Sequence, residues 1–154
     1  MKKRNFLLFI ILLILILSIF TSCEDKRTPE DILFNITKDI STLPEGKVYL
    51  GRAEEGSAAY LSPMMISALY GEGAVSYEFT FIEDFAVYIS SFAKPCEVAV
   101  YKCYSASDTD LIASMCLSRI ENLKTVLAGT SFSESILNAS VEISGRFVIV
   151  TMVS

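Results

Sequence analysis

The sequence contains no histidine. Histidine is the commonest general base and the commonest metal ligand in proteins, because its pKa lies near neutrality. A zinc site in this chain would have to use cysteine and carboxylate side chains alone, and the cysteines do not cluster. The Gly-x-Ser-x-Gly turn of the serine hydrolases is also missing. We therefore expect no metal, no cofactor and no catalytic site.

Long apolar runs are missing everywhere except at the N-terminus. A short basic start precedes an unbroken apolar run at residues 6–17, which leads through Thr21 and Ser22 to Cys23. This order is typical of a secretory signal peptide. A cysteine directly after the small residues is the bacterial lipoprotein variant, in which the thiol receives a diacylglyceryl group. We predict that residues 1–22 are a lipoprotein signal peptide and that Cys23 is lipidated.

Two other interpretations of this leader stay open. The first is an uncleaved transmembrane anchor, although the run from Phe6 to Phe20 has 15 residues and spanning a bilayer takes about 20. The second is ordinary secretion. Phe20 stands where the usual lipobox has leucine, which favours these alternatives slightly. A lipidated Cys23 and an anchor both place the protein on the outer face of the cell membrane.

Positive charge is scarce in the rest of the chain. Removing residues 1–22 leaves 132 residues, enough for one domain. It also removes three of the 13 basic residues. The remaining chain has ten basic and 18 acidic residues, so its net charge is near −8. This balance argues against nucleic acid as a partner, and against binding an anionic lipid surface through the domain's own side chains. The membrane contact is expected to run through Cys23.

Three cysteines follow the leader: Cys96, Cys103 and Cys116. The first two flank one predicted strand and would lie about 23 Å apart on opposite faces, too far for a disulfide, which needs Cα atoms within about 7 Å. Buried free thiols are the interpretation that we favour. A disulfide from either one to Cys116, and a reactive thiol, stay open as alternatives.

Helical spacing and capping residues predict three helices. Thr28-Pro29 and Ser62-Pro63 are N-cap and first-turn pairs, and acidic residues open the third and longest helix. The predicted helices cover residues 29–40, 62–70 and about 107–128.

Alternating apolar residues predict the strands. A hairpin-length connection at residues 92–95 separates the first two, and a turn at Ser144-Gly145 separates the last two. Residues 47–61 are ambiguous, with Val48-Tyr49-Leu50 a short strand at most. The predicted strands cover residues 84–90, 97–101, 141–143 and 147–153, the last being apolar on both faces as in a central strand.

The order of these elements favours an α+β fold, because like elements occur in runs and do not alternate strictly. We expect a small, mostly antiparallel sheet of three or four strands packed against two to three helices. Residues 23–28 form a tether, and residues 29–154 form a single domain.

Several segments resemble a known family. Glu97 to Lys102, Tyr70-Gly71, Arg119 and the segment Gly145 to Val148 follow, in order, a pattern of the small Gram-positive bacterial lipoproteins catalogued as domain of unknown function 4358. The resemblance covers about residues 64–154. It departs after the long helix, where the family pattern has Tyr and then Pro-Glu. It implies an envelope lipoprotein and no particular reaction.

Charged residues within the predicted elements provide two more hypotheses. Arg119 lies on the flank of the apolar stripe of the long helix, where an unpaired buried guanidinium would cost several kcal/mol. We predict an ion pair between Arg119 and Glu97, with a structural role; a ligand-facing Arg119 stays open. The acidic residues between 72 and 84 lack the ligand pattern of a calcium loop, and we expect a solvated loop there.

The leading functional hypothesis is a non-catalytic binding module at the cell envelope, anchored by Cys23, with an envelope protein or a wall or membrane component as its partner. The alternative is a small envelope hydrolase that uses carboxylates such as Glu97 or Asp84. An assembly part without a ligand is the third possibility. A carboxylate pair in a concave pocket would favour the hydrolase, and a grooved apolar surface would favour the module.

Overall fold

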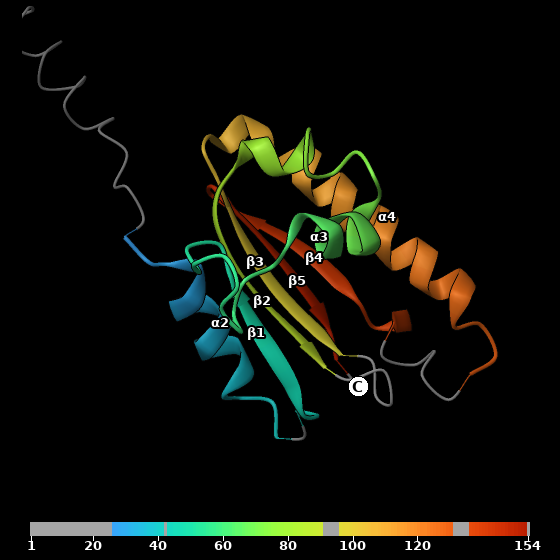
Figure 1. Cartoon of the computed structure of the whole chain (residues 1–154). Helices are drawn as coiled ribbons and strands as arrows, with labels where there is room; N and C mark the ends of the chain where they lie inside the picture. The colour runs from blue at the N-terminus through green and yellow to red at the C-terminus, as the bar shows by residue number, and fades with distance from the viewer. Residues whose placement is uncertain (1–25, 42, 91–95, 131–135, 154) are drawn as a thin grey trace, which may run out of the picture.

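The computed structural model describes residues 26–41, 43–90, 96–130 and 136–153. These residues form one antiparallel sheet with helices packed on both of its faces (Figure 1). The predicted α+β class is confirmed. The predicted strand number is wrong, since the sheet has five strands.

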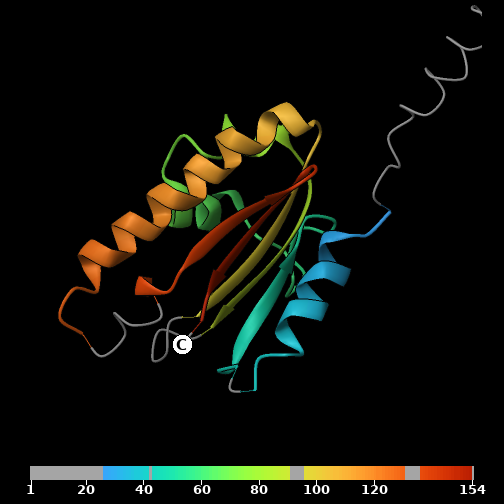
Figure 2. The ribbon, with the colours of Figure 1, turned by 180° about the vertical axis from the view of Figure 1, so that it is seen from behind.

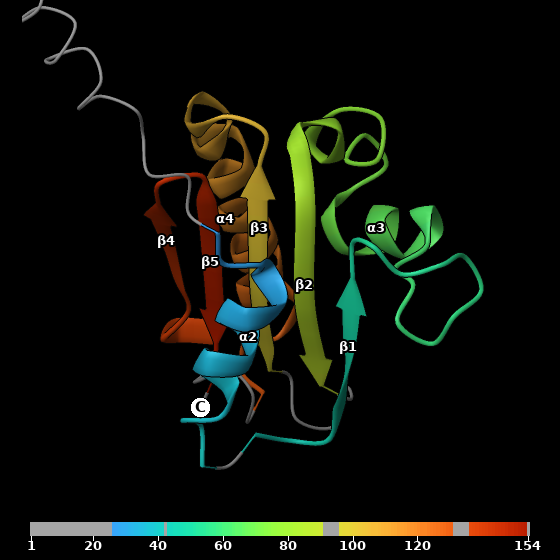
Figure 3. The ribbon, with the colours of Figure 1, turned by 90° about the vertical axis from the view of Figure 1, so that its left-hand side faces the viewer.

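All neighbouring strands in the sheet are antiparallel, and the two edge strands are β1 and β4 (Figure 3). The order across the sheet is β1 (Gly46–Leu50), β2 (Ile82–Ser90), β3 (Glu97–Cys103), β5 (Phe147–Met152) and β4 (Ser140–Ser144). The fifth strand is β1, which falls in the segment that the sequence left ambiguous. An edge strand buries little of either face, so the first three residues of β1 are exposed and the period-two pattern is weak.

The helices divide between the two faces of the sheet. One face carries α2 (Pro29–Thr37), which packs on β2 and β3. The other carries α3 (Pro63–Tyr70) and the 18-residue α4 (Thr109–Val126), as the view from behind shows (Figure 2). Two 3-10 turns, Glu78–Phe81 and Ala106–Asp108, precede β2 and α4. Among the described residues, no helix combines the length and the apolar character that crossing a membrane requires.

Helix α2 ends earlier than predicted. Thr28 begins the helix through a capping box: its hydroxyl accepts a hydrogen bond from the Asp31 amide, and its own amide donates to the Asp31 carboxylate. After Thr37 the bonds tighten to an i→i+3 pattern, with the Ile40 amide donating to the carbonyl of Thr37 at 3.2 Å. The predicted connection at residues 92–95 lies outside the described residues.

The core consists of two apolar clusters, one on each face of the sheet. Alternate residues of each strand enter opposite clusters: Val98 and Val100 of β3 lie under α2, whereas Ala99 and Tyr101 lie under α4. Strand β5 contributes Phe147 to the first cluster and Val148 and Val150 to the second, which explains why its sequence is apolar at both alternating positions.

Candidate functional site

A groove of about 710 Å³ lies between the edge strand β1 and helix α3. Its volume falls in the range of about 300–1,000 Å³ typical of ligand sites. Its apolar lining belongs to the core cluster under α4, so the groove is on the α4 face of the sheet. The ribbon shows α3 beside β1 (Figures 1 and 3). The lining side chains come from β1, β2 and α3 and are mainly apolar. The lining residues are Glu45, Gly46, Lys47, Tyr49, Met65, Ala68, Leu69, Ile89 and Ser90.

The sequence of α3 determines which of its side chains face the groove. Ser62 caps the helix by accepting a hydrogen bond from the Met65 amide at 3.3 Å, and Gly71 ends it at a φ of 105°. Met65 lies in the groove wall, whereas its neighbour Met64 is 80% exposed. Two methionines adjacent in the chain thus point to different surroundings.

The outer edge of β1 presents backbone groups to solvent beside this groove. The Leu50 amide points away from β2 and donates to the carbonyl of Ala59 at 2.9 Å. Because backbone groups alternate along an antiparallel strand, the amides and carbonyls of Gly46 and Val48 point away from β2 as well. Among the described residues, none hydrogen-bonds to these groups of Val48. Two alternate residues of β1 can therefore accept a further strand.

Two charges of opposite sign stand at the mouth of the groove. Glu45 and Lys47 lie two residues apart and line the same side of the groove as Tyr49. Both are exposed, and neither forms a salt bridge with another described residue. The groove-facing row along β1 is therefore acidic, basic and aromatic in that order.

A buried ion pair lies directly behind the groove wall. Arg119 donates to Oε2 of Glu97 through Nε at 2.9 Å and Nη2 at 2.6 Å, and Nη1 donates to the carbonyl of Leu69 at 3.0 Å. The Tyr70 hydroxyl donates to Oε1 of Glu97 at 3.3 Å, and its ring lies 5.4 Å from the guanidinium carbon. The side chains of Arg119 and Glu97 are 12% and 4% exposed. The structure thus brings together the two residues that the sequence paired.

Burial and the Glu97 charge shift the pKa of three groups in this cluster. Burial raises the pKa of Tyr70 well above its ordinary value, and the Glu97 charge raises it further; burial also raises the pKa of Tyr101, whose hydroxyl shares a hydrogen bond with that of Tyr70. For Arg119, burial is the largest single influence and lowers the pKa, but the charge and hydrogen bonds of Glu97 together with Tyr70 and Tyr101 outweigh it, so the net direction is upward. None of these three groups is poised to exchange a proton. The arrangement joins α3, α4 and β3.

A second hollow, of about 420 Å³, lies on the opposite face between α2 and the β4–β5 hairpin. Its apolar floor includes Ile32, Ile36 and Ile149, and its rim carries Asp39 and Glu142. No described residue adds an unpartnered buried polar group to it. This hollow is smaller than the α3–β1 groove, and more of its lining is polar.

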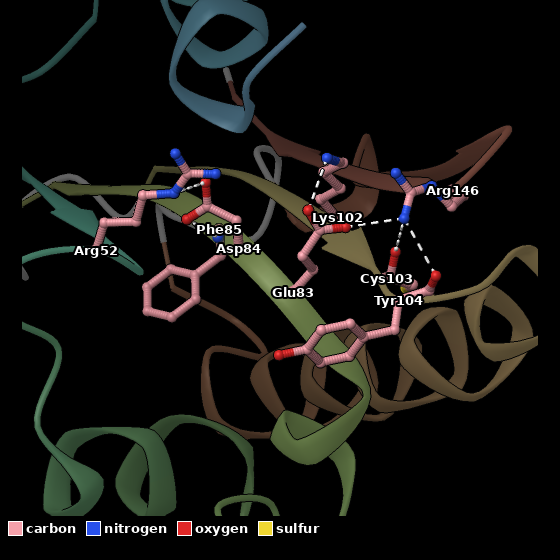
Figure 4. A network of polar contacts seen from close by, with 8 residues as sticks. All are labelled: Arg52, Glu83, Asp84, Phe85, Lys102, Cys103, Tyr104 and Arg146. Carbon is pink, nitrogen blue, oxygen red and sulfur yellow. Dashed lines mark hydrogen bonds and ion pairs between the residues drawn. The ribbon is translucent and has the colours of Figure 1, made fainter. Parts of the chain in front are cut away.

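A network of ion pairs occupies the other end of the sheet (Figure 4). Glu83 lies between two cations, with Oε1 2.9 Å from Lys102 Nζ and Oε2 2.8 Å from Arg146 Nη1. Asp84 is 7% exposed and pairs with Arg52 at 2.9 Å. The expectation of a solvated acidic loop is therefore wrong for Glu83 and Asp84, which lie in β2 and are neutralised by cations from neighbouring segments.

The three cysteines within the described ranges are free and buried. Cys96 lies in the cluster under α2, whereas Cys103 and Cys116 share the cluster under α4. Burial raises the pKa of Cys96 and of Cys103 to about 11, and it raises that of Cys116 as well. The fourth cysteine, Cys23, lies outside the described residues.

Sequence reasoning identified Glu97 and Arg119 but missed the groove and most partners of the ion pair. In the described parts of the chain, no group of three or more cysteine, aspartate or glutamate side chains is arranged to hold a metal ion. No protein-family model, curated protein or solved structure matches this chain. The resemblance to the family of unknown function stays a prediction.

Proposed function

We propose that this protein is a non-catalytic binding module, anchored on the outer face of the cell membrane by lipid at Cys23. The observation that carries the proposal is the α3–β1 groove: a concave, mainly apolar surface bordered by an open strand edge and by two charges that form no salt bridge with any described residue. Exposed apolar concavities of this kind are typical of interaction sites. The partner in this proposal is a component of the cell envelope, and the chain is a relative of the family that it resembles.

The contacts of the carboxylates weigh against the hydrolase alternative. Glu97 is held by Arg119 and Asp84 by Arg52, and neither carboxylate lines either hollow. The two lie at opposite ends of the strand pair, since Asp84 is opposite Lys102 and Ile89 is opposite Glu97. A glycosidase-type pair needs two carboxyl groups on either side of one bond.

One serine motif in the sequence also bears on the hydrolase alternative. Ser91 and Lys94 have the Ser-x-x-Lys spacing of penicillin-binding proteins. The sequence has neither the Ser-Asp-Asn nor the Lys-Thr-Gly motif that accompanies it. Both residues lie outside the described residues, and the binding module remains the better-supported function.

Photo-crosslinking from two adjacent positions tests the module. A photoreactive amino acid replaces Met65, which lines the groove, or Met64, which is 80% exposed, in the full chain expressed in its own membranes. We expect one envelope component to crosslink at Met65 and not at Met64. Equal products at both positions, or none at Met65, would reject the groove as the binding site.

The anchor has its own test. Mass spectrometry of the mature N-terminus reads the modification of Cys23 directly, and membrane fractionation of Cys23→Ala reads its consequence. We expect a diacylglyceryl-modified Cys23 in the wild type and no lipid on Cys23→Ala, which is found either as the released mature chain or as the uncleaved precursor. A mature chain that retains residues 1–22 with an unmodified thiol would show an anchor of the transmembrane type.

A further inference from the structure

We propose that the α3–β1 groove takes an extended polypeptide, which pairs with the outer edge of β1 as a sixth, antiparallel strand. This inference rests on the proposed function and names the chemistry of the partner. Strand addition to a sheet edge obtains affinity from backbone hydrogen bonds and specificity from the pockets that receive alternate side chains. Both requirements are met along β1, the first at its outer edge and the second on the face that borders the groove.

The backbone requirement is met at Gly46 and Val48. Their amides and carbonyls point away from β2, by the alternation that the Leu50–Ala59 hydrogen bond establishes. Val48 is 41% exposed, so its flank is open to an incoming chain. At the C-terminal end of β1 the outer edge is already occupied, because the Leu50 amide donates to Ala59. The added strand is therefore limited to the segment beside the groove.

The side-chain requirement is met by the groove itself. Every second residue of an added strand would project into the space between β1 and α3, where Tyr49, Met65 and Leu69 offer apolar contact. The intervening residues would project to the opposite face of the sheet. A flexible methionine in the wall suits a partner side chain of variable shape.

The charges at the mouth define the sequence of the partner. Residues opposite Glu45, Lys47 and Tyr49 fall at positions that are not hydrogen-bonded, where facing side chains come closest. Opposite charges there stabilise the pair and like charges destabilise it. An antiparallel partner therefore carries, from its N-terminus, an apolar residue, an acidic residue and a basic residue at alternate positions.

Two synthetic peptides test this order. In the matched peptide, threonines alternate with leucine, glutamate and lysine in that order; in the swapped peptide, lysine precedes glutamate. Binding to the purified full chain in detergent is measured by fluorescence anisotropy. We expect the matched peptide to bind on the order of five-fold more tightly. The double variant Glu45→Lys/Lys47→Glu should reverse this preference, and an unchanged preference would overturn the proposed charge register.

Val48 provides the test of backbone pairing. Val48→Pro removes an amide that β2 does not use, so the edge strand should tolerate it, whereas Val48→Thr keeps that amide. We expect Val48→Pro to abolish binding of both peptides and Val48→Thr to preserve it, with circular dichroism checking that both variants fold. If Val48→Pro does not fold, hydrogen exchange of the wild type provides the test instead. We then expect the Val48 amide to exchange more slowly when the peptide is bound.

Failure of this inference is distinguishable from failure of the proposed function. If neither peptide binds, or if the bound peptide leaves hydrogen exchange at Val48 unchanged, strand addition is rejected. Capture of a non-peptide component at Met65 would then keep the binding module and replace its partner. Absence of any product at Met65 would reject both.

Discussion

Arg119 of α4 donates two hydrogen bonds to the same carboxylate oxygen of Glu97 in β3, at 2.9 and 2.6 Å. A third bond reaches the carbonyl of Leu69 in the last turn of α3. The guanidinium thereby ties both helices of one layer to the central part of the sheet. Because the pair is largely buried, each charge depends on the other for its stability.

Arg119→Met should lower the free energy of unfolding by about 3–5 kcal/mol, because it leaves the Glu97 carboxylate buried without a cation. Urea denaturation measures this effect. The double variant Glu97→Leu/Arg119→Met is the matched control, and it should lose less stability than Arg119→Met alone. Full stability of Arg119→Met together with loss of the Met65 crosslink would instead assign Arg119 to ligand binding.

Gly46→Ala should destabilise the protein by about 1–3 kcal/mol through overpacking. A Cβ at this position would lie 2.5 Å from the carbonyl oxygen of Ile89 and 2.6 Å from the hydroxyl of Tyr88. Tyr88 cannot easily retreat, since that hydroxyl donates to the carbonyl of Pro44. Gly73→Ala serves as the control in thermal or urea denaturation, because a Cβ there meets nothing within 4 Å; equal effects of the two changes would contradict the packing argument.

The buried thiols should resist alkylation in the native protein. Burial raises the pKa of Cys96 and Cys103 to about 11, so little thiolate forms at neutral pH, and the side chains are also shielded from reagent. We expect iodoacetamide to modify Cys96, Cys103 and Cys116 only at the rate of unfolding, as read by mass spectrometry with and without urea. Fast modification of any of them in native buffer would support the reactive-thiol alternative.

The Glu83 network should make stability depend on pH in the acidic range. The hydrogen bond from Lys102, followed by the charges of Lys102 and Arg146, lowers the pKa of the Glu83 carboxyl. The unfolded chain then binds more protons, so the stabilisation is complete above about pH 4.3, the unfolded pKa, and is lost as the pH falls through the folded pKa. Glu83→Gln should flatten this dependence in urea denaturation.

Lys102→Met provides the companion measurement. It removes the principal donor to Glu83 and should weaken the same pH dependence. In the Glu83→Gln background it should cause no further change in slope. A slope that is unchanged in Glu83→Gln would show that other carboxyl groups dominate acid unfolding.

Elements with strong local patterns were predictable from the sequence. Helix α4 has acidic residues at its start and an apolar stripe, and β5 is apolar on both faces because its side chains enter both core clusters. Strand β1 was not predictable from the sequence, because an edge strand with three exposed residues has no clear alternation of apolar and polar residues. Its place in the sheet is determined by pairing with β2, more than thirty residues later in the chain.

The site was only partly predictable for the same reason. Glu97 and Arg119 could be paired because a charge on an apolar surface requires a partner. The groove combines residues 45–49 with Met65 and Leu69, and no local pattern indicates that these segments meet. Asp84 and Arg52 likewise come together only because β1 ends beside the start of β2.

The order of elements along the chain also determines how mechanical load would pass through the molecule. Helix α2 follows the N-terminal segment directly, and β1 is the next element after it. A pull between the N-terminus and the outer edge of β1 therefore acts on α2 and on its packing against β2 and β3, whereas β4 and β5 lie outside this path. Because only Pro29, Ile32 and Leu33 of α2 are buried, we expect α2 to detach from the sheet first under such tension and to lengthen the tether.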